Sequence, residues 1–301
     1  MSHKLDADDL FIHRFQAHCA EHRLNFFLIE PLWAEAFLAR LEAGELTVRV
    51  LLNMQSEHHD PTEIYHRLIR AADRLGTQVI DPPDVALAAF DKARLHPQLA
   101  AAGLPVPPTI VVPAADRGSF TLTDDQRDAL GTPFVIKPAL GYGRRGVIID
   151  ATSEADLQRS AALWPEGNHL LQRRIVPRSI EGEPAYFRVY FVFGATHLVW
   201  WNCFTDHYRT LGPDEEAELG LQPLRELAQQ VARLTGMRFF SSEIAQTESG
   251  DFVLIDYVND QCHMLAQSAD PRIGVPDELV GTIARQLVEN AARLLRSPAQ
   301  Q

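Results

Sequence analysis

Two acidic residues near the end of the chain are the first candidates for chemistry. Glu243 lies in RFFSSEIAQ (238–246) and Asp256 in DFVLIDYV (251–258), and both segments have the apolar, β-branched and aromatic content of strands. The short TESG between them predicts a hairpin. Either a two-residue or a four-residue turn there places Glu243 directly opposite Asp256.

Two carboxylates in that position need a compensating charge. Opposed residues have Cβ atoms ~4.5–5.5 Å apart, and like charges at that separation are destabilising. A divalent cation is the simplest solution, because Mg²⁺ takes one or two carboxylates and leaves its other positions to phosphate and water. The alternatives are that one carboxyl pairs with an arginine, such as Arg238 or Arg188, or that it is protonated. The hairpin alone leaves these possibilities open.

A second candidate feature is the glycine-rich segment FVIKPALGYGRRGVIID (134–150), which predicts two strands joined by a cationic tip. The tip carries Gly141, Gly143, Gly146, Arg144 and Arg145. Glycines let the backbone approach a ligand, and successive N–H groups can cradle phosphate oxygens. A solvated turn with surface arginines is the alternative. Because Lys137 ends the first strand and a carboxylate pair follows downstream, we favour a nucleoside triphosphate with Mg²⁺ or Mn²⁺. The tip is not a Walker loop, since GxxxxGK is absent.

Composition restricts the class of protein. The 301 residues are 46% hydrophobic and 23% charged, which predicts a globular protein of two domains. The formal net charge of −12 argues against a nucleic-acid partner. The first residues lack the pattern of a signal peptide, and the most apolar stretch is interrupted by Arg188 and Gly194, so we expect no membrane segment. Three scattered cysteines indicate a reducing cytoplasm.

The first part of the chain alternates strands and helices, which predicts a small parallel sheet. The expected strands are 24–30, 47–54 and 77–81, and the expected helices are 7–22, 31–44 and 61–76. The segment EHHD (57–60) is interpreted as a capped loop. A further helix over 85–103 is expected to be interrupted at Pro97.

The second part predicts an α+β arrangement with antiparallel hairpins. The expected strands are 104–113, 169–176, 186–194, 196–204, 238–246 and 251–258, and the expected helices are 123–130, 153–164, 223–236 and 277–296. Trp200 and Trp201 favour packing over substrate stacking. The segment DHYRT (206–210) is expected near the mouth of the site. There His207 or Arg209 either binds an anionic substrate or belongs to a plain polar loop.

The order of these parts resembles the ATP-grasp superfamily over about residues 90–295. The motif layout is most similar to the glutathione synthetase and ribosomal-protein glutamate ligase type. The segments that carry the resemblance are DK, LAAAGLPVPPTIVV, PFVIKPALGYGRRGV, HLLQRRIV, YFRVYFVFG, SSEIA and VLIDYVND. It implies an α/β and α+β fold: an N-terminal parallel-sheet domain over 1–90 and an ATP-grasp unit over 91–301. The small lobe would cover about 104–170 and the large lobe about 171–301.

The resemblance also implies roles for individual residues. Lys92 and Lys137 would contact the ATP phosphates, and the loop containing Gly141, Gly143, Arg144 and Gly146 would close over them. The hinge with Gln172, Arg173 and Ile175 would hold adenine, and Glu183 or Glu181 would reach the ribose. Arg188 would neutralise the transferred phosphate, and Glu243, Asp256 and Asn259 would hold the metal.

Three features depart from the family pattern. Tyr186 and Phe187 precede Arg188 where a more polar pair is frequent. Gln172 stands where an acid is common. Asn259 follows Asp256 after two residues instead of one, so in a regular strand it faces away from Asp256. A β-bulge, or an early end of the strand, would restore the amide to the metal side.

The function implied by the resemblance is ATP-dependent ligation of a carboxylate to an amine through an acyl phosphate. The substrates would be small molecules or peptides, and the protein could form a homodimer. A kinase of the same fold and a non-catalytic nucleotide-binding protein are the alternatives.

Overall fold

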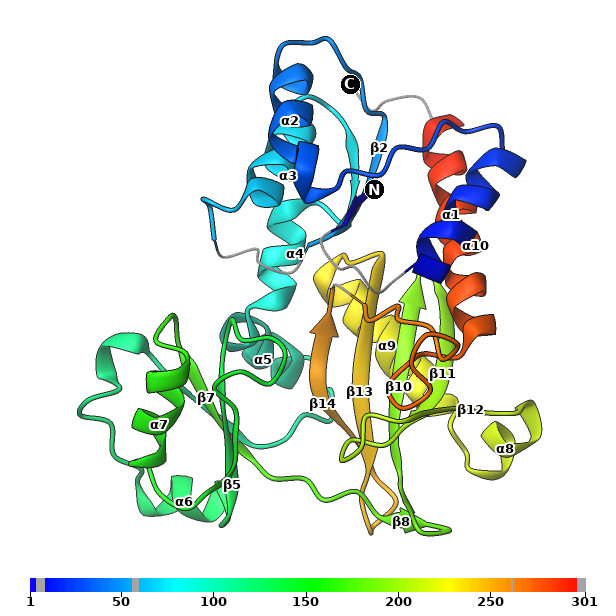
Figure 1. The fold of residues 1–301 in the computed structure, drawn as a ribbon. Helices are drawn as coiled ribbons and strands as arrows, with labels where there is room; N and C mark the ends of the chain where they lie inside the picture. Colours follow the sequence, from blue (N-terminus) through cyan, green and yellow to red (C-terminus); the bar gives the residue numbers. More distant parts are fainter. Residues whose placement is uncertain (4–8, 56–59, 261, 297–301) are drawn as a thin grey trace.

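The computed structural model describes residues 1–3, 9–55, 60–260 and 262–296. Within these residues the strands form three sheets and one two-stranded ribbon. Figure 1 shows the three sheets as separate units, with the N-terminal one above the other two. Most of EHHD lies outside the described residues.

The N-terminal unit is a small parallel sheet, as expected, but its first strand differs from the prediction. The order is β1 (Ser2–His3), β2 (Val50–Met54) and β3 (Gln78–Ile80). The prediction of a strand over 24–30 is wrong. That segment runs beside the chain start, where Met1 N donates to Phe27 O and Ile29 N donates to Met1 O, each over 2.9 Å. The helical elements η1 (Pro31–Trp33), α2 (Ala34–Glu42) and α3 (Ile64–Arg74) complete this unit.

The helix expected over 85–103 is broken earlier than predicted. It divides into α4 (Pro83–Phe90) and α5 (Lys92–Ala101), and Pro97 lies inside α5. The break occurs at Asp91, whose carboxylate accepts hydrogen bonds from Ala93 N and Arg94 N. This N-cap stabilises a new helix start. As a consequence, Lys92 lies in the first turn of α5 and faces the interior.

The small lobe is a four-stranded antiparallel sheet covered by two helices. Its strand order is β4 (Thr109–Val112), β7 (His169–Arg173), β5 (Phe134–Pro138) and β6 (Ile148–Ala151). The preceding η2 (Ala114–Asp116) is a single turn, and α6 (Asp124–Leu130) and α7 (Asp156–Leu163) pack on the sheet. Phe134 and Ile136 alternate into the core on this side. The sheet therefore holds the glycine-rich connection between β5 and β6.

The large lobe contains a five-stranded antiparallel sheet. Its order is β12 (Tyr208–Thr210), β11 (Ala195–Trp201), β10 (Tyr186–Val192), β13 (Phe239–Gln246) and β14 (Phe252–Asn259). A ribbon of β8 (Ser179–Ile180) and β9 (Glu183–Pro184) precedes it. The sheet is buried on both faces, so β10 reads as a continuous apolar run apart from Arg188.

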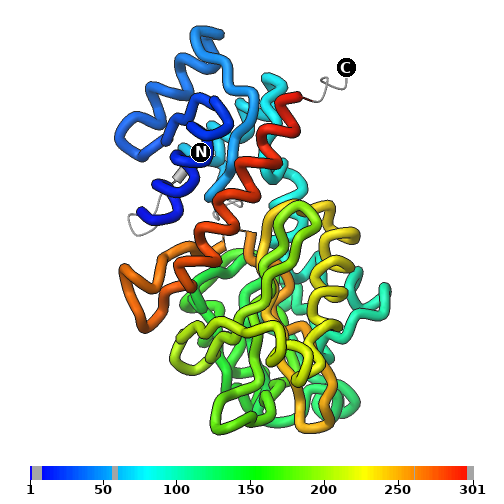
Figure 2. Tube along the Cα trace, turned by 90° about the vertical axis from the view of Figure 1, so that its right-hand side faces the viewer, coloured from blue at the N-terminus to red at the C-terminus, as the bar shows by residue number. Residues whose placement is uncertain are grey.

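Helices cover both faces of this sheet. On one face α9 (Gln222–Thr235) packs with α4 and α5, and on the other α10 (Asp277–Arg296) packs beside α1 (Asp9–Glu21). The short α8 (Pro213–Glu218) lies outside. Figure 2 shows α10 running from the large lobe up to the N-terminal unit. There Arg49 Nη2 donates to Leu295 O over 2.6 Å. Among the described residues, no helix is long and apolar enough to cross a membrane.

Candidate active site

The two acidic residues face each other on β13 and β14, as the hairpin predicted. Glu243 pairs with Asp256, but the register nearer the turn is shifted by one, with Gln246 opposite Phe252. Irregularities on both sides of Glu243 absorb the difference. The one beyond it places Asn259 opposite Ser241. A bulge therefore brings Asn259 to the same cavities as the two carboxylates.

Glu243 is the compensated member of the pair. Its Oε1 forms an ion pair with Arg188 Nη2, and its Oε2 accepts from Tyr186 Oη over 3.2 Å. Burial raises the pKa of Glu243, the adjacent Arg188 opposes that shift, and Asp256 adds to it. The arginine-pairing alternative is thus realised by Arg188. Arg238 pairs with Asp81 instead, at 3.2 Å.

Asp256 is the less compensated member of the pair. Within the described part of the chain, its buried Oδ1 has no hydrogen-bond partner. The nearest cation is Lys92, whose Nζ lies 3.9 Å away. A buried carboxylate oxygen with no partner is costly. Oxygen ligands are those that Mg²⁺ prefers, so Asp256, Glu243 and Asn259 fit this ion in donor type.

Two buried lysines lie next to the carboxylates. Lys137 donates to Ile255 O over 3.0 Å and lies 5.2 Å from the ring centroid of Tyr257. Burial lowers the pKa of Lys137 to about 8, while Asp256 acts in the opposite direction. Lys92 donates to Gly141 O over 3.1 Å, which ties α5 to the glycine-rich loop.

Two cavities meet at the carboxylate pair. The first, of about 360 Å³, lies between the lobes and contains Lys92, Lys137 and the hinge after β7. The second, of about 490 Å³, is lined by the large lobe, notably Arg188, Trp201 and Tyr208. Both are lined by Gly143, Arg144, Glu243, Asp256 and Asn259. A group bound in one cavity can therefore reach a group bound in the other at these residues.

The glycines of the loop have different structural roles. Gly143 lines both cavities and has φ +58°. Gly141 lines the first cavity and packs against Pro138. Gly146, expected at the ligand, lines neither cavity. Its φ is +75°, and a Cβ there would lie 2.8 Å from Pro138 Cγ and from Trp164 Cβ. Close packing explains this glycine.

The expected hinge residues lie at the first cavity, whereas Glu183, expected at the ribose, does not. Gln172, Arg173 and Ile175 line it. Gln172 is buried and donates to Tyr257 Oη over 2.9 Å, a neutral role in place of an acid. The Arg173 side chain turns away and donates to Ala129 O over 2.7 Å. Glu183 lines neither cavity, and its Oε2 accepts from Asn202 Nδ2 over 2.8 Å.

DHYRT contributes Asp206 and Tyr208 to the second cavity, in agreement with its expected place near the mouth of the site, but the sequence predicts no role for these two residues and favours packing for Trp201. Arg188 Nη1 donates to Tyr208 Oη over 2.7 Å, and its guanidinium lies 4.4 Å from the ring centroid of Trp201. Asp206 lines the cavity too. Strand alternation was the available signal. Tyr208 pairs with Trp201 on the cavity face, while Arg209 pairs with Trp200 on the other. Arg209 bonds Glu215 there and is no substrate ligand in this arrangement.

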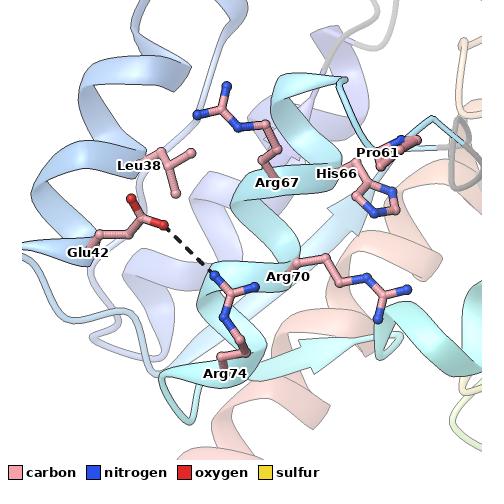
Figure 3. Close-up of a pocket in the computed structure, with 7 residues that line it drawn as sticks. All are labelled: Leu38, Glu42, Pro61, His66, Arg67, Arg70 and Arg74. Carbon is pink, nitrogen blue, oxygen red and sulfur yellow. Dashed lines mark ion pairs between the residues drawn. The ribbon is translucent and has the colours of Figure 1, made fainter.

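A third hollow, of about 260 Å³, lies between α2 and α3, far from these carboxylates in the chain. Figure 3 shows three arginines of α3 around it, with guanidiniums that point in different directions. The pairs are Arg67 with Glu35 at 2.9 Å, Arg70 with Asp84 at 2.5 Å, and Arg74 with Glu42 at 3.9 Å. This hollow offers little net charge to a ligand.

Comparison with known proteins reveals short stretches of sequence similarity. A segment of 95 residues is 37% identical to a D-alanine–D-alanine ligase of Frankia casuarinae, and covers 31% of this chain and 24% of that protein. A segment of 108 residues is 33% identical to the ligase of Nocardia farcinica, with coverage of 35% and 29%. The similarity thus spans about a quarter of the length of these relatives. No protein-family model matches the chain.

Solved structures are similar over nearly the whole chain. A RimK domain protein ATP-grasp from Sphaerobacter thermophilus gives a TM-score of 0.62 at 18% identity, covering 96% of this chain and 98% of that one. The ATP-grasp ligase PsnB, complexed with minimal precursor, Mg and ADP, gives 0.60 at 13% identity, covering 95% and 97%. These likenesses concern the fold, and they confirm the fold class that the order of motifs predicted.

Proposed function

The chain has the ATP-grasp fold, and we propose that it is an ATP-dependent ligase that joins a carboxylate to an amine. The observation that carries the proposal is the meeting of two cavities at one carboxylate pair, with lysines on one side and Arg188 on the other. The names of the relatives, which are ligases, support it.

In this proposal the first cavity binds ATP and the second binds the acid. Lys92 and Lys137 contact the phosphates, and apolar residues including Ile175 pack against adenine. Glu243, Asp256 and Asn259 would hold Mg²⁺ (or Mn²⁺), which would supply positive charge to neutralise the phosphates. Two observations support this assignment: Asp256 Oδ1 has no hydrogen-bond partner among the described residues, and the PsnB complex contains Mg and ADP.

The residues position two reactants and stabilise charge. A carboxylate oxygen of the acid forms a bond to the γ-phosphorus as the bond to ADP breaks, which gives an acyl phosphate. The amine then displaces phosphate. Arg188 borders both Glu243 and the second cavity, so it stabilises charge on the phosphoryl group in transfer. No protein nucleophile is required.

The substrates in this proposal are small-molecule or peptide acids and amines. The division into a domain over residues 1–90 and an ATP-grasp unit over 91–301 belongs to the same proposal, as does a cytoplasmic homodimer.

The experiment is to follow phosphate release from ATP with a panel of carboxylic acids, with hydroxylamine as the amine. An acyl phosphate is trapped as a hydroxamate, and oxygen-18 from the substrate carboxylate appears in phosphate. A stable phosphorylated hydroxyl product identifies a kinase instead. Nucleotide binding without turnover across the panel contradicts the ligase proposal and favours a binding protein.

A further inference from the structure

The tip of the glycine-rich loop is anchored on the large lobe by one ion pair. Arg144 Nη2 lies 2.6 Å from Asp206 Oδ1, and Nη1 lies 3.2 Å from Oδ2. Arg144 Nη2 also donates to Cys203 O over 3.3 Å. The guanidinium is 5.6 Å from the ring centroid of Trp201. The tip of the loop thus reaches the large lobe through the side chain of Arg144, which contacts both carboxylate oxygens of Asp206.

Both members of this pair have unusual backbone conformations. Arg144 has φ +58° and Asp206 has φ +63°, in the left-handed region that favours glycine. A loop already rich in glycine retains a long side chain at one such position. Side chains kept at unfavourable backbone positions concentrate at functional sites, and here two of them contact each other.

The neighbouring cations do not contact Asp206 or Trp201 as Arg144 does. Arg145 stays within its own lobe, with its guanidinium 5.2 Å from the ring centroid of Trp164. Lys137 lies inside the first cavity. Arg144 lines both cavities and bonds the carbonyl of Cys203 at the first, but its guanidinium lies over Trp201 and pairs with Asp206, which both line the second cavity and not the first. The three cations of this hairpin therefore point to different parts of the protein.

We infer that Asp206 is a positioning residue: it holds Arg144 over the second cavity, so that Arg144 acts on the acid substrate and anchors the loop before nucleotide binds. The inference rests on the proposed function and refines it. It reassigns Arg144 from the nucleotide, where the family resemblance places it, to the substrate side.

Hydrogen exchange without nucleotide tests the anchor. Asp206→Asn is expected to raise exchange of the backbone amides of residues 141–147 by about two- to fivefold, the range for a partly exposed ion pair. The matched control is Glu215→Gln. The Arg209–Glu215 pair has distances of 2.7 and 2.9 Å and a guanidinium 4.7 Å from the Trp200 centroid, outside both cavities. That control leaves exchange of 141–147 unchanged.

A charge exchange separates positioning from general stability. Arg144→Asp combined with Asp206→Arg restores the ion pair and is expected to return exchange to the wild-type level, unlike either single change. Unchanged exchange in Asp206→Asn, or no recovery in the double variant, overturns the positioning role.

Binding of AMPPNP with Mg²⁺, measured by calorimetry, tests the reassignment. Arg144→Ala is expected to change affinity by less than about threefold, whereas Lys137→Ala weakens it by about tenfold or more, as for a lost charge-assisted contact. A tenfold loss in Arg144→Ala overturns the inference and returns Arg144 to the nucleotide. If the wild-type protein does not bind AMPPNP, the proposed function fails, and with it the substrate-side role of Arg144. The hydrogen-exchange measurements would still test whether the Arg144–Asp206 pair anchors the loop.

Discussion

The third hollow and the meeting point of the other two cavities both contain cationic side chains, but their charges are balanced differently. Between α2 and α3, each arginine of the third hollow has its own acid, and the members of these pairs are mostly exposed. At the meeting point of the two cavities, Asp256 Oδ1 has no hydrogen-bond partner among the described residues and lies 3.9 Å from Lys92 Nζ, while the buried Lys137 donates to the carbonyl of Ile255. Buried charge that is only partly compensated, more than the shape of a hollow, indicates the place of chemistry.

The largest effect is expected at Asp256. Asp256→Asn keeps the side-chain shape but removes the charge that would hold the metal, so turnover falls by about 10³-fold or more, equivalent to several kcal/mol of lost charge stabilisation. Phosphate release at saturating Mg²⁺ measures it, and circular dichroism checks the fold. The control is Asp251→Asn on the same hairpin, where the carboxylate accepts from Ser249 Oγ. Near-normal turnover in Asp256→Asn contradicts the metal assignment.

The next effect concerns Arg188. Arg188→Ala is expected to lower kcat by about 10²–10³-fold, because it removes a contact that strengthens during phosphoryl transfer. AMPPNP affinity should change much less, since Arg188 lies on the side of the second cavity. The change also leaves Glu243 without its ion-pair partner, so Arg188→Lys is the companion variant that keeps a charge. A large loss of nucleotide affinity with unchanged kcat would indicate that Arg188 acts on the nucleotide in the first cavity, and would contradict its proposed role in phosphoryl transfer.

A smaller effect is expected from the titration of Lys137. Its pKa is lowered by burial from 10.5 to about 8, so the charged form is lost as pH rises through 8. AMPPNP affinity should therefore weaken by up to about tenfold between pH 7 and pH 9 as the protonated fraction falls. Between pH 8 and 10.5 the unfolded chain binds the extra proton, so this residue makes folding stability rise with pH. Lys137→Met should remove both trends. If Lys137→Met shows the same pH dependence as the wild type, both trends arise from another titratable group.

The smallest effect is expected in the third hollow. Arg74 is 67% exposed at its side chain and 3.9 Å from Glu42. Arg74→Ala should leave turnover within about twofold and unfolding free energy within about 0.5 kcal/mol, as for most surface substitutions. Denaturant unfolding and phosphate release measure the two quantities. A tenfold loss of turnover would show that compensated charge can also mark the site, and would remove the contrast between the hollows.

Features with short-range causes were predictable from the sequence. The helix over 277–296 has the bounds that its periodicity indicated, and the 134–150 hairpin forms between β5 and β6. Glu243 and Asp256 face each other because a short turn sets the register to within one residue. Two local signals for a helix break compete between residues 85 and 103. Pro97 suggested the helix break, yet the Asp91 cap determined it.

Features that depend on distant contacts were not predictable. The strand Ser2–His3 has only two residues, so it exists through pairing with Asn53 and Met54 and has no periodicity of its own. Gly146 looked like a ligand glycine, but Trp164 and Pro138 crowd its position. The bulge that turns Asn259 toward the carboxylates arises from the fit of two strands, although the residue spacing showed that one was needed.

The residue types and the order of motifs were sufficient to identify the fold and the carboxylate pair, because turns, caps and strand alternation act between neighbours in the chain. The partners of each charge came only from the folded structure. Arg188 bonds Glu243, Arg238 bonds Asp81 and Arg144 bonds Asp206, and these pairs join segments 55 to 157 residues apart. Sequence shows which charges are present, but an ion pair depends on distances of a few ångströms, which only the packing of sheets and loops sets.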